Sequence, residues 1–141
     1  MSESIAFIGL GAMGGPMAQN IIKKGSKVSI FDIVTEKMDP VVKVGGTPGK
    51  TMKDTIENAE IIVTMLPSTE NVKSVITDKD GILSMAKPNT IILDMSTIAP
   101  TGTDEVYKMC QEKNVKFIDA PVGRLVTVSY THLTLPTRST V

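Results

Sequence analysis

Cysteine is almost missing from this chain of 141 residues, in which Cys110 is the only one. A single cysteine cannot form an internal disulfide, so we expect the chain to belong to a reducing compartment. A small buried side chain on a helix is the favoured role for Cys110, ahead of a nucleophile.

An excess of charge of either sign is also missing, as is any long apolar run. The 15 Lys and Arg residues balance the 15 Asp and Glu residues. Without a basic stripe or an acidic tail, the sequence predicts no nucleic-acid partner. No apolar run approaches the roughly 20 residues that cross a bilayer, and the N-terminus lacks the basic start of a signal peptide. We therefore expect a cytoplasmic protein without a membrane segment.

Short apolar runs alternate with amphipathic stretches from residue 5 to residue 126. The apolar runs are nearly continuous, which is typical of strands that are covered on both faces. Strands are expected at residues 5–8, 27–31, 60–65, 90–94 and 115–119, and helices at residues 13–24, 53–58, 70–76 and 101–113. Strict alternation of strand and helix predicts an α/β fold with a doubly wound parallel sheet of the Rossmann type. Thr101 or Thr103 could cap the last helix.

A glycine-rich motif follows the first predicted strand directly. The stretch IGLGAMGGP places Gly9, Gly11 and Gly14 as GxGxxG at a strand-to-helix turn. In this motif the first glycine permits the tight turn, the second lets a pyrophosphate approach the backbone, and the third lets the helix pack against the sheet. The motif predicts a dinucleotide-binding loop, while a glycine-rich turn that serves only helix packing is the alternative.

An acidic residue ends the second predicted strand. Asp32 lies eighteen residues after Gly14, where a carboxylate can accept hydrogen bonds from the ribose hydroxyls of an adenosine. The carboxylate would repel a 2′-phosphate, and no Arg follows in IVTEKM to attract one, so the sequence favours NAD over NADP. Two alternatives stay open here: a solvated turn residue, and the acidic strand end of a methyltransferase that binds S-adenosylmethionine.

Four motifs lie in order along the chain, namely IAFIGLGAMGGPMAQN, TMLPSTENV, GILSMAKPNTIILDMSTIAP and FIDAPV. Together they resemble the β-hydroxyacid dehydrogenase family, which includes 3-hydroxyisobutyrate dehydrogenase and tartronate semialdehyde reductase. The resemblance covers residues 5–122. Several ordered motifs are more specific than one glycine loop, and they disfavour the methyltransferase.

The resemblance implies roles for residues at the ends of the predicted strands. It implies substrate contact by Ser96, and cofactor contacts by Gly9, Leu10, Gly11, Ala12, Met13, Gly14, Asp32, Leu66, Pro67, Asn71 and Thr97. An exposed polar residue on a helix is the alternative for Asn71, and a helix-capping turn is the alternative for Ser96 and Thr97. For Asp94 and Asp119 we expect strand-end hydrogen bonding, and not a paired-carboxylate site.

The segment after residue 122 departs from the commonest family pattern. Gly123 and Arg124 stand where the family has Ser-Gly-Gly, whose hydroxyl and N–H groups hold the substrate carboxylate. Arg offers a planar fork of donors to carboxylate, phosphate or sulfonate oxygens. The stretch PVGR is similar to the corresponding segment of sulfolactaldehyde reductase, so the resemblance implies that both residues contact a small anionic substrate. A surface arginine on a loop is the alternative for Arg124.

The last residues of the chain resemble the translation of a DNA adapter. Residues 128–137, VSYTHLTLPT, match one reading frame of a transposase adapter that is used to build sequencing libraries. We therefore expect a dinucleotide-binding domain at residues 1–126 and a translated adapter at residues 127–141. Tyr130 and His132, the only His, are accordingly given no catalytic role.

The resemblance implies an NAD-dependent oxidoreductase that moves hydride between nicotinamide and a small 3-hydroxyacid or its semialdehyde, with sulfolactaldehyde as one candidate. The general acid of the family is a lysine in a later segment, which also contains further strands and an all-helical domain. No Lys of this chain stands in a matching motif. We expect an inactive fragment, without catalytic residues or a metal site, of a homo-oligomeric enzyme. A non-catalytic dinucleotide-binding module is the alternative.

Overall fold

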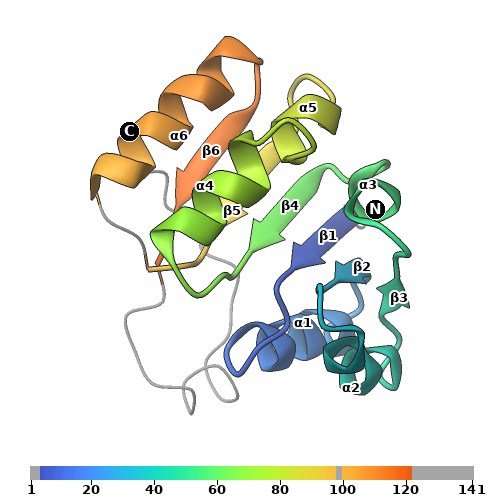
Figure 1. Cartoon of the computed structure of the whole chain (residues 1–141). Helices are drawn as coiled ribbons and strands as arrows, with labels where there is room; N and C mark the ends of the chain where they lie inside the picture. Colours follow the sequence, from blue (N-terminus) through green and yellow to red (C-terminus); the bar gives the residue numbers. More distant parts are fainter. Residues whose placement is uncertain (1–3, 98–99, 122–141) are drawn as a thin grey trace.

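Six short strands pair side by side in the part of the chain that the computed structural model describes, residues 4–97 and 100–121 (Figure 1). They are β1 Ser4–Ile8, β2 Lys27–Phe31, β3 Thr47–Pro48, β4 Ile61–Thr64, β5 Ile91–Asp94 and β6 Lys116–Asp119. All neighbours run parallel, in the order β3-β2-β1-β4-β5-β6. The predicted Rossmann-type sheet is confirmed, and five of its strands lie where the apolar runs placed them.

Strand β3 is the one described strand that the sequence pattern did not predict. It pairs only Thr47 with Ser29 and Pro48 with Ile30, at the edge of the sheet beside β2. Two residues are too few to show an alternating pattern. Proline, which has no N–H to donate, is tolerated in a strand at an edge of this kind.

The connections between the strands are helical. The elements are α1 Gly14–Lys23, the 3₁₀ turn η1 Thr35–Met38, α2 Asp39–Val42, α3 Met52–Ile56, α4 Thr69–Thr77, α5 Ile82–Met85 and α6 Pro100–Glu112. The predicted helices correspond to α1, α3, α4 and α6. The sequence did not predict η1, α2 and α5, because four residues barely complete one helical turn.

The predicted cap of the last helix is wrong. Helix α6 begins at Pro100, so Thr101 and Thr103 both lie inside it. Proline is favoured at the first helical position, where its fixed φ angle suits the helix and its missing N–H costs nothing. The sequence interpretation started this helix one residue late.

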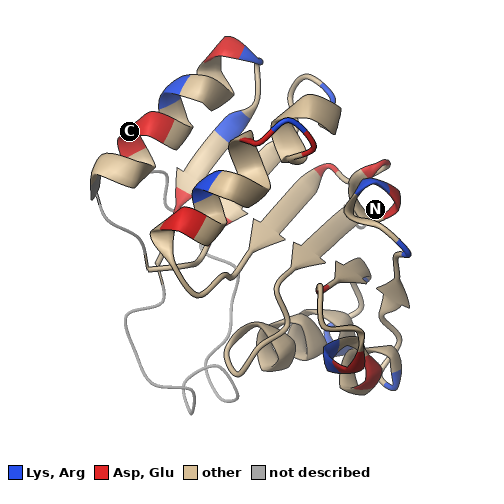
Figure 2. Ribbon diagram, viewed as in Figure 1, with Lys and Arg blue, Asp and Glu red and all other residues tan. Residues whose placement is uncertain are grey.

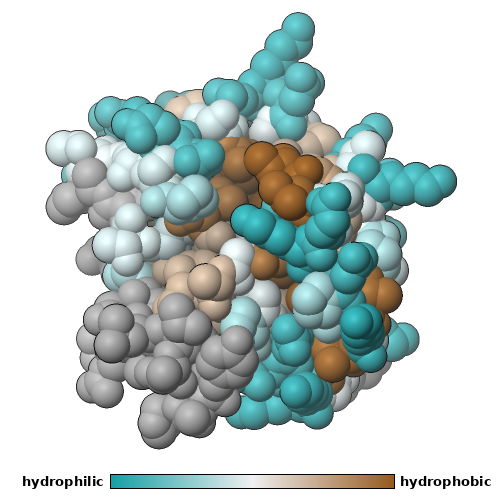
Figure 3. Space-filling view, turned by 60° about the horizontal axis from the view of Figure 1, so that its bottom comes forward, coloured by the Kyte–Doolittle hydropathy of each residue, from teal (hydrophilic) through white to brown (hydrophobic). Residues whose placement is uncertain are grey.

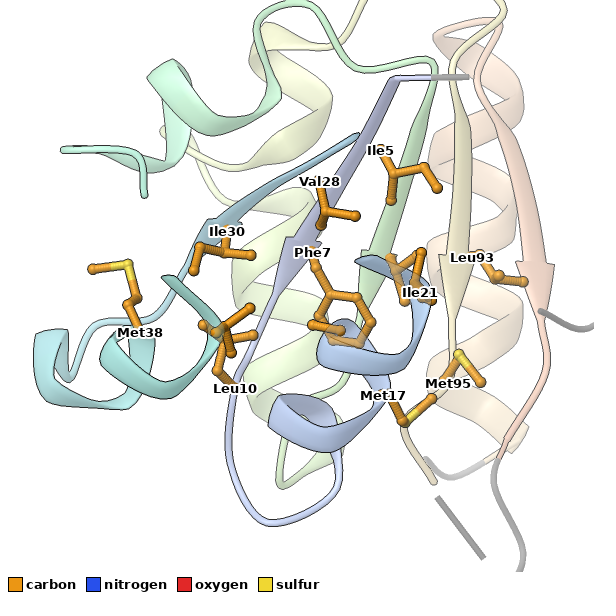
Figure 4. Close-up of a cluster of buried hydrophobic side chains, with 13 residues drawn as sticks. Ile5, Phe7, Leu10, Met17, Ile21, Val28, Ile30, Met38, Leu93 and Met95 are labelled. Atoms are coloured by element: carbon orange, nitrogen blue, oxygen red, sulfur yellow. The ribbon is translucent and has the colours of Figure 1, made fainter. Parts of the chain in front are cut away.

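Alternate residues of each strand enter two separate hydrophobic cores. In β1, Ile5 and Phe7 face one core, and Ala6 and Ile8 face the other. Figure 4 shows the first core, in which side chains from the sheet pack against Met17 and others of α1. The second core lies under α3, α4, α5 and α6. Burial on both faces explains why the strands read as nearly continuous apolar runs.

The chain order creates a crevice between β1 and β4. From β1 the chain moves outward through β2 to β3, and β4 then returns to the other side of β1. The segments that leave the carboxyl ends of β1 and β4 therefore pass to opposite faces of the sheet. In open α/β sheets a ligand binds at such a switch point.

The charged residues lie mainly on the helices and loops, with both signs mixed along the described surface (Figure 2). Lys73 of α4 and Glu105 of α6 form an ion pair. No helix in the described ranges is both long and apolar enough to cross a membrane.

Candidate functional site

A cleft of about 650 Å³ opens at the carboxyl ends of β1, β2 and β4. Its walls come from the glycine-rich loop, the segment after β2, the start of α3, and the segment that leads into α4. Asp32 and Lys37 are the charged residues among those that line it, and most of the others are apolar. Figure 3 turns the lower side of Figure 1 forward and shows hydrophobic side chains at the surface among hydrophilic ones.

The glycine loop fits the roles that the motif predicts. Gly9 has a φ of +97°, and a side chain there would collide with the carbonyl oxygen of Met65. A side chain on Gly14 would collide with the carbonyl oxygen of Gly9. A Cβ on Gly11 would meet nothing within 4 Å, so the backbone at Gly11 is open to the cleft. Gly9 and Gly14 serve the turn and the packing, and Gly11 leaves room for a ligand.

The loop ends at the start of α1, which offers a favourable environment for an anion. Met13 precedes the helix without a side-chain cap, and the first turn of α1 contains no acidic residue. Helix N-termini direct N–H groups and a partial positive charge toward a bound phosphate. The loop and the helix start together form a part of the cleft that is suited to an anionic group.

Asp32 joins the end of β2 to the glycine loop. Its Oδ2 accepts a hydrogen bond from the Leu10 N–H at 2.8 Å, and its Oδ1 accepts one from the Val34 N–H at 2.8 Å. The residue is 9% exposed and lines the cleft. Each carboxylate oxygen has more than one acceptor site. The same carboxylate can therefore hold the loop and still accept hydrogen bonds from ribose hydroxyls.

The segment after β4 forms the opposite wall of the cleft. Leu66, Pro67 and Asn71 all line it. Ser68 is the N-cap of α4, where its Oγ accepts a hydrogen bond from the Asn71 N–H at 3.2 Å. The Ser68 hydroxyl donates in turn to Asn71 Oδ1 at 2.5 Å. Asn71 thus stabilises the start of α4 and also reaches the cleft, so its two predicted roles are compatible.

A buried polar group lies behind this wall, at the end of β5. Asp94 Oδ1 accepts hydrogen bonds from the Thr64 hydroxyl at 2.9 Å and the Ser96 N–H at 3.1 Å. Within the described chain Asp94 Oδ2 has no hydrogen-bond partner. Burial raises the pKa of Asp94; hydrogen bonds from Ser96 and Thr64 oppose the rise, and the nearby charge of Asp119 adds to it. The predicted strand-end hydrogen bonding of Asp94 is confirmed.

Asp119 lies beside Asp94 in the parallel register of β5 and β6. Burial raises the pKa of Asp119 as well. Neither aspartate lines the cleft.

Most of the predicted cofactor residues come together in the cleft. The nine that line it are Gly9, Gly11, Ala12, Met13, Gly14, Asp32, Leu66, Pro67 and Asn71. Leu10 is buried and contributes its N–H to Asp32, while Thr97 is exposed beyond β5 and does not line the cleft. Ser96 is 0% exposed. The predicted substrate residues Gly123 and Arg124 lie outside the described residues.

Several lining residues were not singled out from the sequence. Lys37 lines the cleft from η1, close in sequence to Asp32. Ile33 is 88% exposed and Val34 is 43% exposed, both directly after Asp32, and Met52 and Val75 add further apolar surface. Apolar residues such as Ile33 and Val34 are usually buried, so nothing in the sequence indicated that they would be exposed. The predicted preference for NAD rests on the absence of Arg from this stretch, but Lys37 is a cation that could attract a 2′-phosphate.

The described residues contain no group of three or more His, Cys, Asp or Glu side chains that could hold a metal ion.

Cys110 is fully buried in the second core, and burial raises the pKa of its thiol to about 12. A thiol in that state is not a nucleophile, because the reactive species is the thiolate.

Comparison with known proteins gives consistent matches. A sequence model of the NAD binding domain of 6-phosphogluconate dehydrogenase matches residues 4–126. The chain is 38% identical over 121 residues to the NAD-dependent L-serine dehydrogenase of Pseudomonas aeruginosa, and also to the 3-sulfolactaldehyde reductase of Escherichia coli. The Mycobacterium tuberculosis 3-hydroxyisobutyrate dehydrogenase has the same fold, with a TM-score of 0.86 at 32% identity.

These matches cover most of this chain but less than half of the relatives. The two sequence matches span 86% of the chain and 41% of each relative. The structural match spans 92% of the chain and 44% of the Mycobacterium tuberculosis protein.

Proposed function

Because the chain belongs to the family of NAD-binding domains that includes the one in 6-phosphogluconate dehydrogenase, with β-hydroxyacid dehydrogenases among its relatives, we propose that its cleft binds NAD as the cofactor half of a hydroxyacid dehydrogenase. One observation carries this proposal. The open backbone of Gly11, the carboxylate of Asp32 and the Leu66–Pro67 wall border one cleft at the switch point of the sheet.

Each wall of the cleft has a part in holding the cofactor. Gly11 and the start of α1 receive the pyrophosphate, and Asp32 receives the hydroxyls of the adenosine ribose. The apolar side chains of Ile33 and Met52 line the same cleft, and Leu66 and Pro67 support the cofactor from the opposite wall. Bound NAD supplies hydride chemistry through its nicotinamide, while the protein orients cofactor and substrate.

The substrate that we propose is a small 3-hydroxyacid or its semialdehyde, with sulfolactaldehyde as one candidate. Thr97 and Ser96 lie at the carboxyl end of β5, and the family resemblance puts the reacting end of the cofactor there. Arg124 and Gly123 would hold the anionic group of the substrate. The catalytic lysine of the family matches no Lys in this chain, so we propose that the chain alone does not turn over. We also propose that the whole protein is a cytoplasmic homo-oligomer.

NAD is proposed as the preferred cofactor over NADP. The Asp32 carboxylate faces the position of the adenosine ribose, where it would repel a 2′-phosphate. Lys37 borders the same cleft and would attract that phosphate, so the preference depends on the balance between these two charges. The Asp32 carboxylate is held in place by two backbone N–H groups, which favours its influence over that of an exposed lysine.

The test of this function is a fluorescence titration of the 141-residue chain with NADH, NADPH and S-adenosylmethionine. We expect saturable binding of NADH, weaker binding of NADPH, and no displacement of NADH by S-adenosylmethionine. Displacement by S-adenosylmethionine would favour a methyltransferase, and equal binding of both dinucleotides would contradict the preference for NAD.

We also propose that residues 1–126 are native and that residues 127–141 are translated adapter. The match to the family ends at residue 126, which supports a junction at this point. Resequencing the locus without that transposase adapter tests the division. A reading frame that continues into a glycine-rich helical segment with a lysine supports the dehydrogenase. A genuine stop after VSYTHLTLPTRSTV would contradict the adapter and favour a non-catalytic dinucleotide-binding module.

A further inference from the structure

A chain of buried and partly buried hydrogen bonds lies behind the Leu66–Pro67 wall of the cleft. The Leu66 N–H donates to Ser96 Oγ at 2.7 Å, and the Ser96 N–H donates to Asp94 Oδ1 at 3.1 Å. The Thr64 hydroxyl donates to the same carboxylate oxygen at 2.9 Å. Thr64, Asp94 and Ser96 are each 0% exposed, and none of them lines the cleft. They therefore lie behind the wall and do not border the cleft.

The Ser96 hydroxyl accepts a backbone hydrogen bond just beyond the end of the hydrogen-bond ladder between the strands. The Met95 N–H donates to the Thr64 carbonyl at 2.9 Å, and the Met65 N–H donates to the Ile8 carbonyl at 3.0 Å. Leu66 is the first residue after this ladder, and a side chain supplies its acceptor. On the other side, the Gly9 backbone packs so closely on the Met65 carbonyl that no side chain fits at Gly9. The peptide between Met65 and Leu66 is thus held between the glycine loop and Ser96.

We propose that Ser96 is a positioning residue for the cofactor: its hydroxyl, with Asp94 and Thr64 behind it, holds the Leu66–Pro67 wall in its binding position before the cofactor arrives. This inference rests on the proposed binding of NAD in the cleft. If the wall is ordered before the cofactor binds, no binding free energy is lost in ordering it, and such preorganisation raises affinity. A serine hydroxyl without solvent exposure fits this role better than direct contact with substrate.

The test is NADH titration of matched variants of the 141-residue chain, at a temperature where each variant is folded by circular dichroism. We expect Ser96→Ala to weaken NADH binding about tenfold, as the loss of one partly buried hydrogen bond implies. Thr64→Val removes one donor to Asp94 with little change of shape, and we expect a loss of about threefold. Thr90→Val is the control, because Thr90 is buried at the opposite end of β5, and it should leave the affinity unchanged.

Amide hydrogen exchange gives a readout without nucleotide. In the wild type the Leu66 amide should exchange slowly, and in Ser96→Ala it should exchange at least about tenfold faster, as a lost hydrogen bond implies. The Met65 amide, which is bonded to Ile8, should not change. This pattern separates a local effect on the wall from a general loosening of the fold. If Ser96→Ala does not fold, Thr64→Val provides the same comparison.

The outcomes separate this inference from the function on which it rests. A wild-type chain that does not bind NADH contradicts the proposed function and, with it, a cofactor role for Ser96. A wild-type chain that binds NADH, together with a Ser96→Ala variant that binds equally well, contradicts the inference alone. Rapid exchange of the Leu66 amide in the wild type would also contradict it.

Discussion

Two aspartates stand at strand ends in the two halves of the sheet, and the fold uses them differently. Asp32 follows β2, lines the cleft, and uses its two oxygens to hold two backbone N–H groups. Asp94 ends β5 with no exposed surface, and one of its oxygens accepts both hydrogen bonds. A carboxylate at a strand end is therefore not enough to mark a ligand site. Its position relative to the switch point decides whether it lines the cleft or lies behind the wall.

The largest effect should come from breaking the loop that Asp32 holds. Gly14→Ala places a methyl group against the Gly9 carbonyl oxygen, and we expect a loss of roughly 3 kcal/mol in the free energy of unfolding from this overpacking. Gly11→Ala is the matched control, because a Cβ there meets nothing within 4 Å. It should keep the melting temperature and lose NADH binding. Equal stability of the two variants, measured by urea unfolding, would refute the separate roles of these glycines.

The next effect compares the two carboxylates directly. Asp94→Ala leaves the Thr64 hydroxyl and the Ser96 N–H buried without their acceptor, at a cost of about 2–3 kcal/mol in the free energy of unfolding. Asp32→Ala should reduce the free energy of unfolding less and weaken NADH binding more, because the Asp32 carboxylate faces the cleft. Urea unfolding and NADH titration of both variants check that Asp94→Ala loses more stability and that Asp32→Ala loses more affinity. A larger stability loss for Asp32→Ala would reverse the comparison.

The two halves of the site also differ in how much of them the sequence predicted. The GxGxxG spacing and the acid after β2 are local patterns with a known mechanical reason, so the sequence alone predicts the roles of Gly9, Gly11, Gly14 and Asp32. Behind the other wall, Thr64 and Ser96 lie 32 residues apart in sequence. Only the pairing of β4 with β5 brings them together, and no local pattern records that pairing.

The same reasoning holds for the fold. Five strands were predicted because burial on both faces leaves an apolar run of four or five residues. Strand β3 was missed because two residues show no alternating pattern, and η1, α2 and α5 were missed because four residues barely complete one helical turn. Lys37 was missed for a different reason: the preference for NAD was predicted from the absence of Arg after Asp32, and the lysine in the 3₁₀ turn after β2 was not taken into account.

The pH dependence of stability gives a smaller effect. Because the pKa of Asp94 is raised in the folded chain, its contribution to stability is fully present below the ordinary value of 3.8 and is lost as the pH rises through the folded value. Asp94→Asn removes this titration, so the decline in stability above that pH should become shallower. Part of the decline in stability should remain in Asp94→Asn, because burial raises the pKa of Asp119 as well. Urea unfolding over a pH series checks this, and an unchanged slope would contradict the buried environment of Asp94.

The smallest effect concerns the choice between dinucleotides. Lys37→Ala should weaken NADPH binding about threefold, the size expected for an exposed charge pair, and should leave NADH binding unchanged. Lys43→Ala is the control, because Lys43 is exposed and does not line the cleft. Titration with both dinucleotides at low salt measures the ratio. An equal loss for NADH would show that Lys37 does not act on the 2′-phosphate.

The most direct test of the central claim is to follow backbone amide resonances of the isotope-labelled 141-residue chain while NAD is added. The account predicts saturable shifts at Gly9 to Gly14, Asp32 and Leu66, and much smaller ones in β6 and the outer face of α6. Shifts that gather elsewhere, or no shifts at a concentration of NAD that saturates comparable domains, would contradict the proposal that this cleft is the cofactor site.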